Sequence, residues 1–314
     1  MIISCSRRTD IPAFYSDWFF NRIREGFVLV RNPMNSKQVR NVSLAPQDVD
    51  CIVFWTKDPA PLLDRLHLLK AYNYYFQFTL TPYDKDIEPN LPPKTEIINT
   101  FMKLSDKIGK KRIIWRYDPI LLSQRGDIEY HIEHFEWLAK RLSSHTEKCI
   151  ISFIDMYRHL QGNIADLAIR SPEESEMRVL AEKIAAIANA NNIKVETCAE
   201  KVELADLGIQ HGKCIDDGLI SELTGTKLNI AKDKYQRELC GCVVSVDIGE
   251  YNTCRHRCRY CYANSNPKTV EIKLSLHNDQ SALLIGEAND MPKNTQRNNK
   301  SFSKNRQNCL IERI

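Results

Sequence analysis

Residues 112–154 read RIIWRYDPILLSQRGDIEYHIEHFEWLAKRLSSHTEKCIISFI, and their pattern predicts a strand, a helix and a second strand. Residues 112–116 and 149–154 are β-branched and aromatic runs, which are typical of strands buried on both faces. Between them, Asp127 begins a helical pattern whose apolar face consists of Ile128, Ile132, Phe135, Leu138, Ala139 and Leu142. Two buried strands joined by a helix are the unit from which parallel sheets are built.

The same alternation extends over the first 200 residues. Buried-strand patterns lie at 2–5, 51–55, 74–80, 112–116, 149–154 and 194–198. Helical patterns lie at 15–24, 61–69, 94–108 and 127–142, and a fifth helix is expected to begin with Ser171 as its cap and to end at 189–192. Six β-then-α units imply a parallel sheet with helices outside it, and no glycine-rich phosphate loop follows the first strand.

We therefore predict an α/β fold, a partial (β/α)6 TIM-like barrel with parallel strands. The barrel core is expected to span residues 1–200. A cysteine-rich segment, residues 201–275, is expected to pack on the barrel mouth. Residues 276–314 are expected to form a C-terminal extension with a basic, disordered tail.

The chain has 314 residues, 11 of them cysteines, and a formal net charge of +4. Because it holds neither a run of about 18 apolar residues nor a signal-peptide pattern, we expect a cytoplasmic protein without membrane contact. Cytosolic thiols stay reduced, which favours metal binding or catalysis as the role of the cysteines. Residues 291–314 carry six Lys and Arg side chains against one Glu, so the rest of the chain is nearly neutral. This distribution disfavours a nucleic-acid partner, except at the tail.

Polar side chains follow the predicted strands at their carboxyl ends, where α/β folds gather catalytic groups. The catalytic candidates at this edge are Arg7, Arg8, Asp10, Arg116, Asp118 and Glu200. Such a mixture of cations and carboxylates suits a small polar or anionic substrate. Aspartates near proline are equally typical of caps and turns, so a local role stays open for Asp10 and Asp118.

Two histidines lie three residues apart on the helix predicted at 127–142. Glu129, Glu133 and Glu136 surround His131 and His134. We therefore interpret this face as solvated or partly buried rather than as a metal site.

The strongest motif is Cys254-Arg-His-Arg-Cys258-Arg-Tyr-Cys261. Three thiolates at C-x3-C-x2-C spacing suit three irons of a 4Fe–4S cluster and leave the fourth iron without a protein ligand. Structural zinc requires four ligands, and His256 is poorly placed as the fourth because it lies between two of the cysteines.

This loop, with Tyr260 before its last cysteine, resembles the signature of the radical S-adenosylmethionine superfamily. The resemblance implies a 4Fe–4S cluster on Cys254, Cys258 and Cys261, reductive cleavage of S-adenosylmethionine, and an electron donor such as a flavodoxin or a ferredoxin. It also implies that Tyr260 packs near the adenine and that Asn264 belongs to the cofactor site. A partial (β/α)6 barrel is the architecture of that superfamily, although here the loop follows the sixth predicted strand instead of the first.

Longer segments resemble the domain-of-unknown-function family 1848, whose members carry radical S-adenosylmethionine-like cysteines near the C-terminus. These segments are SRRTDIPAFY at 6–15, FWTKDP at 54–59, WRYDPI at 115–120 and CGC…DIG-Y-TC…YCYAN at 240–264. No reaction follows from this resemblance.

A second group of cysteines comprises Cys198, Cys214, Cys240 and Cys242. Four thiolates can ligate a second iron–sulfur cluster or a zinc ion, and we favour the cluster. The alternative is that Cys198 and Cys214 are small buried residues and only the Cys240–Cys242 pair is redox active. The leading hypothesis for the whole chain is a radical S-adenosylmethionine-like enzyme. The competing ones are a non-catalytic iron–sulfur or zinc protein that senses redox state or binds a partner, and a nucleic-acid-modifying enzyme.

Overall fold

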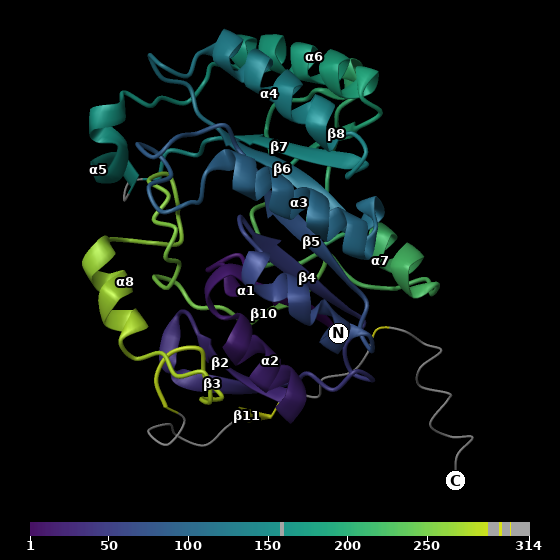
Figure 1. Cartoon of the computed structure of the whole chain (residues 1–314), viewed down its shortest axis with the longest axis vertical. Helices are drawn as coiled ribbons and strands as arrows, with labels where there is room; N and C mark the ends of the chain where they lie inside the picture. Colours follow the sequence, from purple (N-terminus) through teal and green to yellow (C-terminus); the bar gives the residue numbers. More distant parts are fainter. Residues whose placement is uncertain (158–159, 288–294, 297–301, 303–314) are drawn as a thin grey trace.

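The structure is a computed structural model that describes residues 1–157, 160–287, 295–296 and 302 (Figure 1). Most of the predicted basic tail lies outside these residues. Within the tail, Thr295–Gln296 form the short strand β11, and Phe302 packs against buried residues and donates its backbone N–H to Asp50. No helix in the described ranges is long and apolar enough to cross a lipid bilayer.

Eight strands form one sheet in which every neighbouring pair is parallel. The six predicted strands are confirmed, and in spatial order they are β1 Ile2–Cys5, β4 Cys51–Thr56, β5 Tyr74–Thr79, β6 Ile113–Ile120, β7 Lys148–Phe153 and β8 Lys194–Thr197. Two short strands complete the edges: β10 Val246–Asp247 beside β1, and β9 Gln210–His211 beside β8. In the part of the chain that the structure describes, β9 and β10 do not pair with each other, so a closed TIM barrel is not seen.

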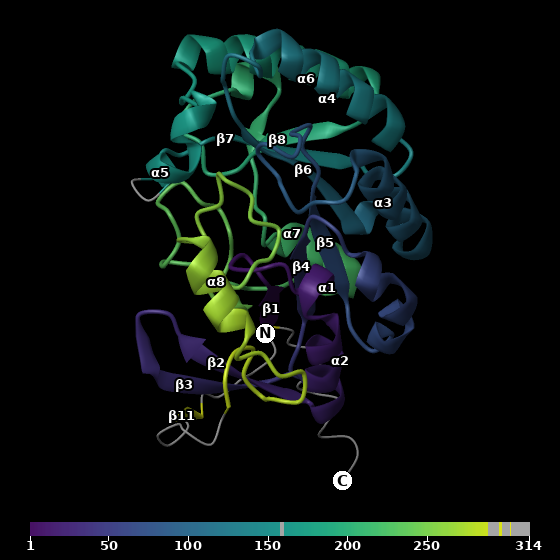
Figure 2. The same cartoon turned by 60° about the vertical axis from the view of Figure 1, so that its left-hand side comes forward.

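Helices follow the strands and cover one side of the sheet (Figures 1 and 2). The main ones are α2 Ser16–Glu25, α3 Lys94–Ile108, α4 Ile128–Leu142 and α6 Glu174–Ala190, together with the 3-10 helix η1 Ala60–Leu69. Shorter helices are α1 Ile11–Phe14, α5 Gln161–Ile164 and α8 Pro267–Leu274. The helix α7 Asp217–Thr224 packs on the opposite side of the sheet, where Ile220 lies in the same apolar cluster as Val53 and Tyr75. The cap predicted at Ser171 is wrong: Glu173 precedes the helix, and its N–H donates to the side chain of Glu176 at 2.9 Å.

A hairpin that the sequence analysis did not predict lies apart from the main sheet. Its antiparallel strands are β2 Phe27–Asn32 and β3 Asn35–Ser43, and β11 pairs with β3. Four successive residues of β3, from Asn35 to Gln38, are exposed. This strand therefore lacks the apolar alternation from which half-buried strands are predicted.

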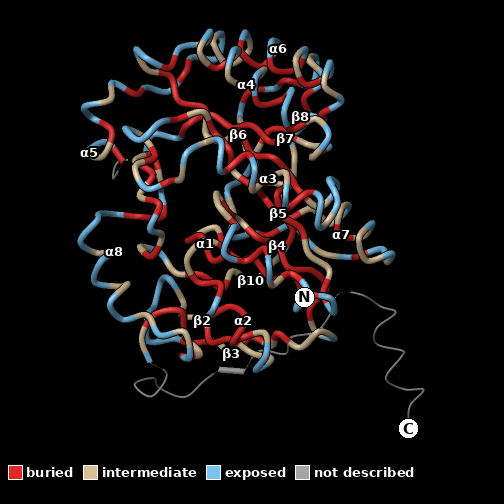
Figure 3. Tube along the Cα trace, viewed as in Figure 1, coloured by how far each residue is buried: buried red, intermediate tan, exposed pale blue. Residues whose placement is uncertain are grey.

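The strands of the main sheet are largely buried (Figure 3), and two clusters of apolar side chains pack on their two faces. On the helical side, Trp115 stacks on Phe135 of α4, and Phe78 contacts Phe101 of α3. On the other side, alternate strand residues such as Val53, Tyr75 and Ile114 pack against buried residues of the segment that follows β8. Because side chains alternate across a strand, this inner face continues into Trp55, Gln77 and Arg116 toward the carboxyl ends.

Candidate functional site at the carboxyl edge of the sheet

Buried Arg116 and half-buried Asp118 form an ion pair near the carboxyl end of β6. Arg116 Nε donates to Asp118 Oδ2 at 2.9 Å, its Nη1 lies 3.2 Å from Gln77 Oε1, and Ser152 donates to the other Asp118 oxygen. Burial by itself raises the pKa of Asp118, but Arg116 and Ser152 outweigh it and the net shift is downward. Asp118 is therefore an anion that fixes the orientation of the Arg116 guanidinium.

Asp10 joins three segments of the chain. Its carboxylate accepts from Ala13 N at 3.0 Å, from Lys57 N at 2.7 Å and from His256 Nε2 at 2.9 Å. Because a carboxylate only accepts, Nε2 is the protonated nitrogen of His256. The alternative left open for Asp10, a local capping role, is thus confirmed, since Asp10 is the N-cap of α1. The same side chain also anchors the cysteine loop to the ends of β1 and β4.

Asp247 in β10 organises the turn that follows β1. It accepts from Ser4 Oγ at 3.0 Å, from Arg7 N at 2.9 Å and from the hydroxyl of Ser6, and Arg8 Nε lies 3.9 Å away. Arg8 therefore faces the C-terminal segment, whereas the Arg7 guanidinium lies 5.4 Å from the centre of the Trp55 ring. Arg116 lies 5.1 Å from the same ring, so Trp55 brings both predicted arginines to one place.

Glu88 is a buried carboxylate that the sequence analysis missed. Lys57 Nζ lies 2.7 Å from its Oε1 and Thr81 donates at 2.8 Å, while Lys94 and the Tyr260 hydroxyl also bind it. Burial alone raises the pKa of Glu88, but the two lysines lower it to about 2. Two cations against one anion leave a net positive charge beside Tyr260 and Cys258.

The three cysteines of the C-x3-C-x2-C loop are close neighbours. Burial raises the pKa of all three thiols, and Cys261 adds to the increase at Cys254 and at Cys258 through its charge. In the side-chain conformations of the described residues, no three His, Cys, Asp or Glu groups are already arranged around one point for a single metal ion. A cubane cluster does not require this convergence, because each cysteine binds a different iron.

Several buried polar atoms near this loop have no hydrogen-bond partner within the described chain. They are Arg7 Nε and Nη2, Thr9 Oγ1, Trp55 Nε1, His256 Nδ1 and Asn264 Oδ1. Leaving a buried polar atom unpaired costs about 1–3 kcal/mol, so their concentration at one edge suits a polar ligand. The Asn264 side chain is held on its other side, where Nδ2 donates to Cys254 O at 2.8 Å.

The second group of cysteines lies on the inner face of the sheet. Cys198 Sγ is 3.3 Å from Cys214 Sγ, and Cys242 is hydrogen bonded to Cys214 and Cys240. Arg116 Nη1 donates to Cys214 Sγ at 2.8 Å. The structure therefore brings together four cysteines that are spread over 45 residues of sequence.

Glu200 lies beyond the end of β8, near this second group. Its Oε1 accepts the backbone N–H of Phe153 at 2.9 Å. Burial raises its pKa to about 7, and the negative charges of Asp155, Asp118 and Cys198 contribute. Glu200 can thus hold a proton at neutral pH, which is what a general acid requires.

His131 is fully buried, which the interpretation of a solvated or partly buried face did not anticipate. Its Nε2 donates to Leu121 O at 2.8 Å, and its Nδ1 accepts from the Tyr117 hydroxyl at 2.9 Å. Burial lowers its pKa to about 4. His134 instead bonds the backbone of its own helix at Tyr130 O.

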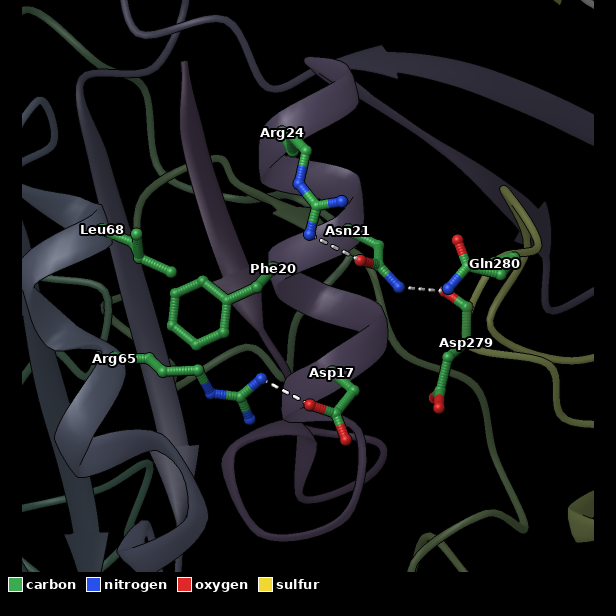
Figure 4. Close-up of a pocket in the computed structure, with 8 residues that line it drawn as sticks. All are labelled: Asp17, Phe20, Asn21, Arg24, Arg65, Leu68, Asp279 and Gln280. Atoms are coloured by element: carbon green, nitrogen blue, oxygen red, sulfur yellow. Dashed lines mark hydrogen bonds and ion pairs between the residues drawn. The ribbon is translucent and has the colours of Figure 1, made fainter.

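A separate cavity of about 350 Å³ lies between α2, η1 and the chain at 279–280 (Figure 4). Its polar groups bind one another: Arg65 pairs with Asp17, Arg24 donates to Asn21, and Asn21 donates to Asp279 O. No residue of the cysteine groups lines it. This cavity is therefore distinct from the candidate site.

These features define an α/β protein with a large parallel sheet, one cysteine group at the carboxyl edge of the sheet and a second on its inner face. The chain belongs to the family described as Domain of unknown function (DUF1848), whose family model matches residues 2–263. The match confirms the family resemblance and includes both cysteine groups. A comparison with curated proteins found no match.

Proposed function

We propose that this chain is an enzyme that holds a 4Fe–4S cluster on Cys254, Cys258 and Cys261 and uses S-adenosylmethionine to start a radical reaction. The observation that carries the proposal is the position of this cysteine loop, at the carboxyl edge of a parallel sheet and beside unpaired buried polar atoms. When bound, such a cluster supplies the electron for reductive cleavage of S-adenosylmethionine. The parallel sheet, with β1 and β4 to β8 in sequential order, is compatible with the partial barrel expected of this class.

The chain supplies the loop with a rigid support. Asp10 holds His256 within the loop, and Asn264 holds the carbonyl of Cys254. Lys57 and Lys94, offset by only one carboxylate, place positive charge near Cys258. That positive charge stabilises the cysteine thiolates and the negatively charged 4Fe–4S cluster that they would hold.

The remaining polar groups divide into two sets. Asn264 Oδ1 and His256 Nδ1 lie on or next to the loop and suit the amino group and hydroxyls of S-adenosylmethionine, while Tyr260 contributes a buried ring. Arg7 and Trp55 offer unpaired N–H donors farther along the edge, which suits an anionic group on a small substrate. Arg116 and Asp118 would orient that substrate, and Glu200 would hold a proton. A flavodoxin or a ferredoxin would supply the electron.

Anaerobic reconstitution tests this proposal. The wild-type chain and Cys149→Ala, which alters a buried cysteine on the helical side of the sheet, should take up about four iron and four sulfide at this loop. Cys258→Ala should lose most of both. Iron and sulfide below one cluster per chain in the wild type, or equal amounts in Cys258→Ala, would contradict the proposal. Stoichiometric zinc without sulfide would instead favour a non-catalytic metal protein.

A further inference from the structure

We propose that Cys198, Cys214, Cys240 and Cys242 bind one thiophilic metal ion, zinc or ferrous iron, at a site separate from the Cys254 loop. The four sulfurs form a continuous series of contacts, from Cys198 to Cys214, Cys242 and Cys240. The cysteines come from the end of β8, the loop after β9 and the loop before β10. Three separate segments thus converge to place thiols together.

The spacing of the sulfurs favours one ion over a cubane cluster. Four thiolates around zinc, each with a Zn–S bond of about 2.3 Å, lie about 3.8 Å from one another. The ligands of a cubane sit on different irons and lie farther apart. The distance of 3.3 Å between Cys198 Sγ and Cys214 Sγ is close to the sulfur–sulfur distance around one zinc ion. It is longer than the roughly 2.0 Å of a disulfide bond, so the two thiols are not oxidised to a disulfide. In the conformations that the structure gives them, the four sulfurs do not surround one point, so binding of an ion requires cysteine side chains to rotate about χ1.

The backbone around the sulfurs is already fixed. The carbonyl of Cys214 accepts from Tyr75 Oη at 2.7 Å and from Gln77 Nε2 at 2.9 Å. The N–H of Ile215 donates to Cys242 Sγ at 3.3 Å. At Gly241, an added Cβ would lie 3.0 Å from Lys213 Cγ and 3.3 Å from Gly212 O. Glycine between the two cysteines therefore lets this loop approach the Cys214 segment, as a shared site requires.

Nearby cations offset the charge of the site. Four thiolates around a divalent ion carry a net charge of −2, which is costly to bury without compensation. Arg116 Nη1 donates to Cys214 Sγ at 2.8 Å, and N–H donors to ligand sulfur are typical second-shell contacts of metal thiolates. Arg7 also lies within electrostatic range of Cys242 and Cys214. If these cysteines only filled space in an apolar core, the two arginines beside them would have no partner of opposite charge in this cluster.

Metal analysis of a chain that lacks the other cysteine loop tests this site directly. The full-length variant Cys254→Ala/Cys258→Ala/Cys261→Ala, purified without oxygen, should contain about one zinc or iron per chain and no acid-labile sulfide. Adding Cys240→Ser and Cys242→Ser should reduce that metal at least tenfold. Adding Cys51→Ser should leave it unchanged, because Cys51 lies in the same apolar layer and its thiol contacts a backbone carbonyl, not another sulfur.

The wild-type chain provides a second measurement if the triple variant does not fold. After removal of iron and sulfide, Cys240→Ser/Cys242→Ser should bind one zinc fewer than the wild type. Three results would overturn the proposal: metal content unaffected by both substitutions, iron with an equal amount of sulfide in the triple variant, or a Cys198–Cys214 disulfide in the anaerobic protein. Because the triple variant cannot hold the proposed 4Fe–4S cluster, its metal content tests the second site independently of the proposed function.

Discussion

His256 Nε2 lies 2.9 Å from Asp10 Oδ2, and this contact joins the cysteine loop to the first strand across 246 residues of sequence. Both side chains are buried. Asp10 also receives the backbone N–H of Lys57, so one carboxylate sets the position of the loop relative to β1 and β4. The placement of the proposed cluster ligands therefore depends on Asp10.

Asp10→Asn should destabilise the fold and reduce iron uptake. The amide keeps one acceptor oxygen but turns its NH2 group either toward Ala13 N or toward both Lys57 N and His256 Nε2, all of which are donors. We expect a loss of about 2 kcal/mol in the free energy of unfolding, because buried hydrogen bonds to charged groups are among the stronger ones. Urea unfolding and iron analysis measure the two effects.

Asp17→Asn is the matched control. Asp17 pairs with Arg65, but its side chain is 69% exposed. Its loss should cost less than about 0.5 kcal/mol and leave iron uptake unchanged. Equal effects of the two substitutions would show that Asp10 does not position the loop.

Gly249→Ala should destabilise the chain, because the added methyl group would push β10 away from the turn after β1. A Cβ at this position would lie 2.2 Å from Ser6 Oγ and 2.5 Å from Ser6 Cβ. Such overpacking costs about 1–3 kcal/mol. The double variant Gly249→Ala/Ser6→Gly should recover part of that loss, whereas Gly162→Ala, where nothing lies within 4 Å, should not destabilise the chain. A Gly249→Ala chain as stable as the wild type would be inconsistent with this packing.

The buried His131 predicts a pH dependence of stability that does not involve the cysteines. Its pKa is lowered from 6.5 to about 4 in the fold, so below pH 6.5 the unfolded chain binds a proton that the folded chain does not. Stability should therefore fall as the pH drops from 6.5 to 4, by up to about 3 kcal/mol. Denaturant unfolding of the wild type against His131→Gln across this range isolates the contribution.

His134 lies one turn further along the same helix and serves as the comparison. His134→Gln should keep the wild-type slope of stability against pH, and His131→Gln should flatten it. A His131→Gln slope equal to that of the wild type would mean that His131 titrates in the folded state near its ordinary pKa.

The sequence pattern predicted the parallel sheet because its six main strands are continuous apolar runs, which both layers of the fold require. It did not predict β2 and β3, since the exposed residues of β3 carry no apolar periodicity. It also placed His131 on a charged face, because the neighbouring glutamates are close in sequence while Tyr117 and Leu121, which bury the ring, are not. Tertiary packing decides such positions.

The candidate site was predictable as a set of strand-end residues and cysteines, but not as a network. Asp10, Arg116 and Asp118 stand out in sequence because they directly follow or end strands. Glu88 gave no such signal, since it lies in a loop several residues beyond β5. Its role arises only when Lys57, Lys94 and Tyr260 converge on it.

Electron paramagnetic resonance of the reconstituted and reduced chain, recorded before and after addition of S-adenosylmethionine, tests the central claim most directly. The account predicts a reduced iron–sulfur signal that changes on addition of S-adenosylmethionine in the wild type and in Cys149→Ala, and that is absent in Cys258→Ala. A signal that S-adenosylmethionine leaves unchanged, or one that persists in Cys258→Ala, would contradict it.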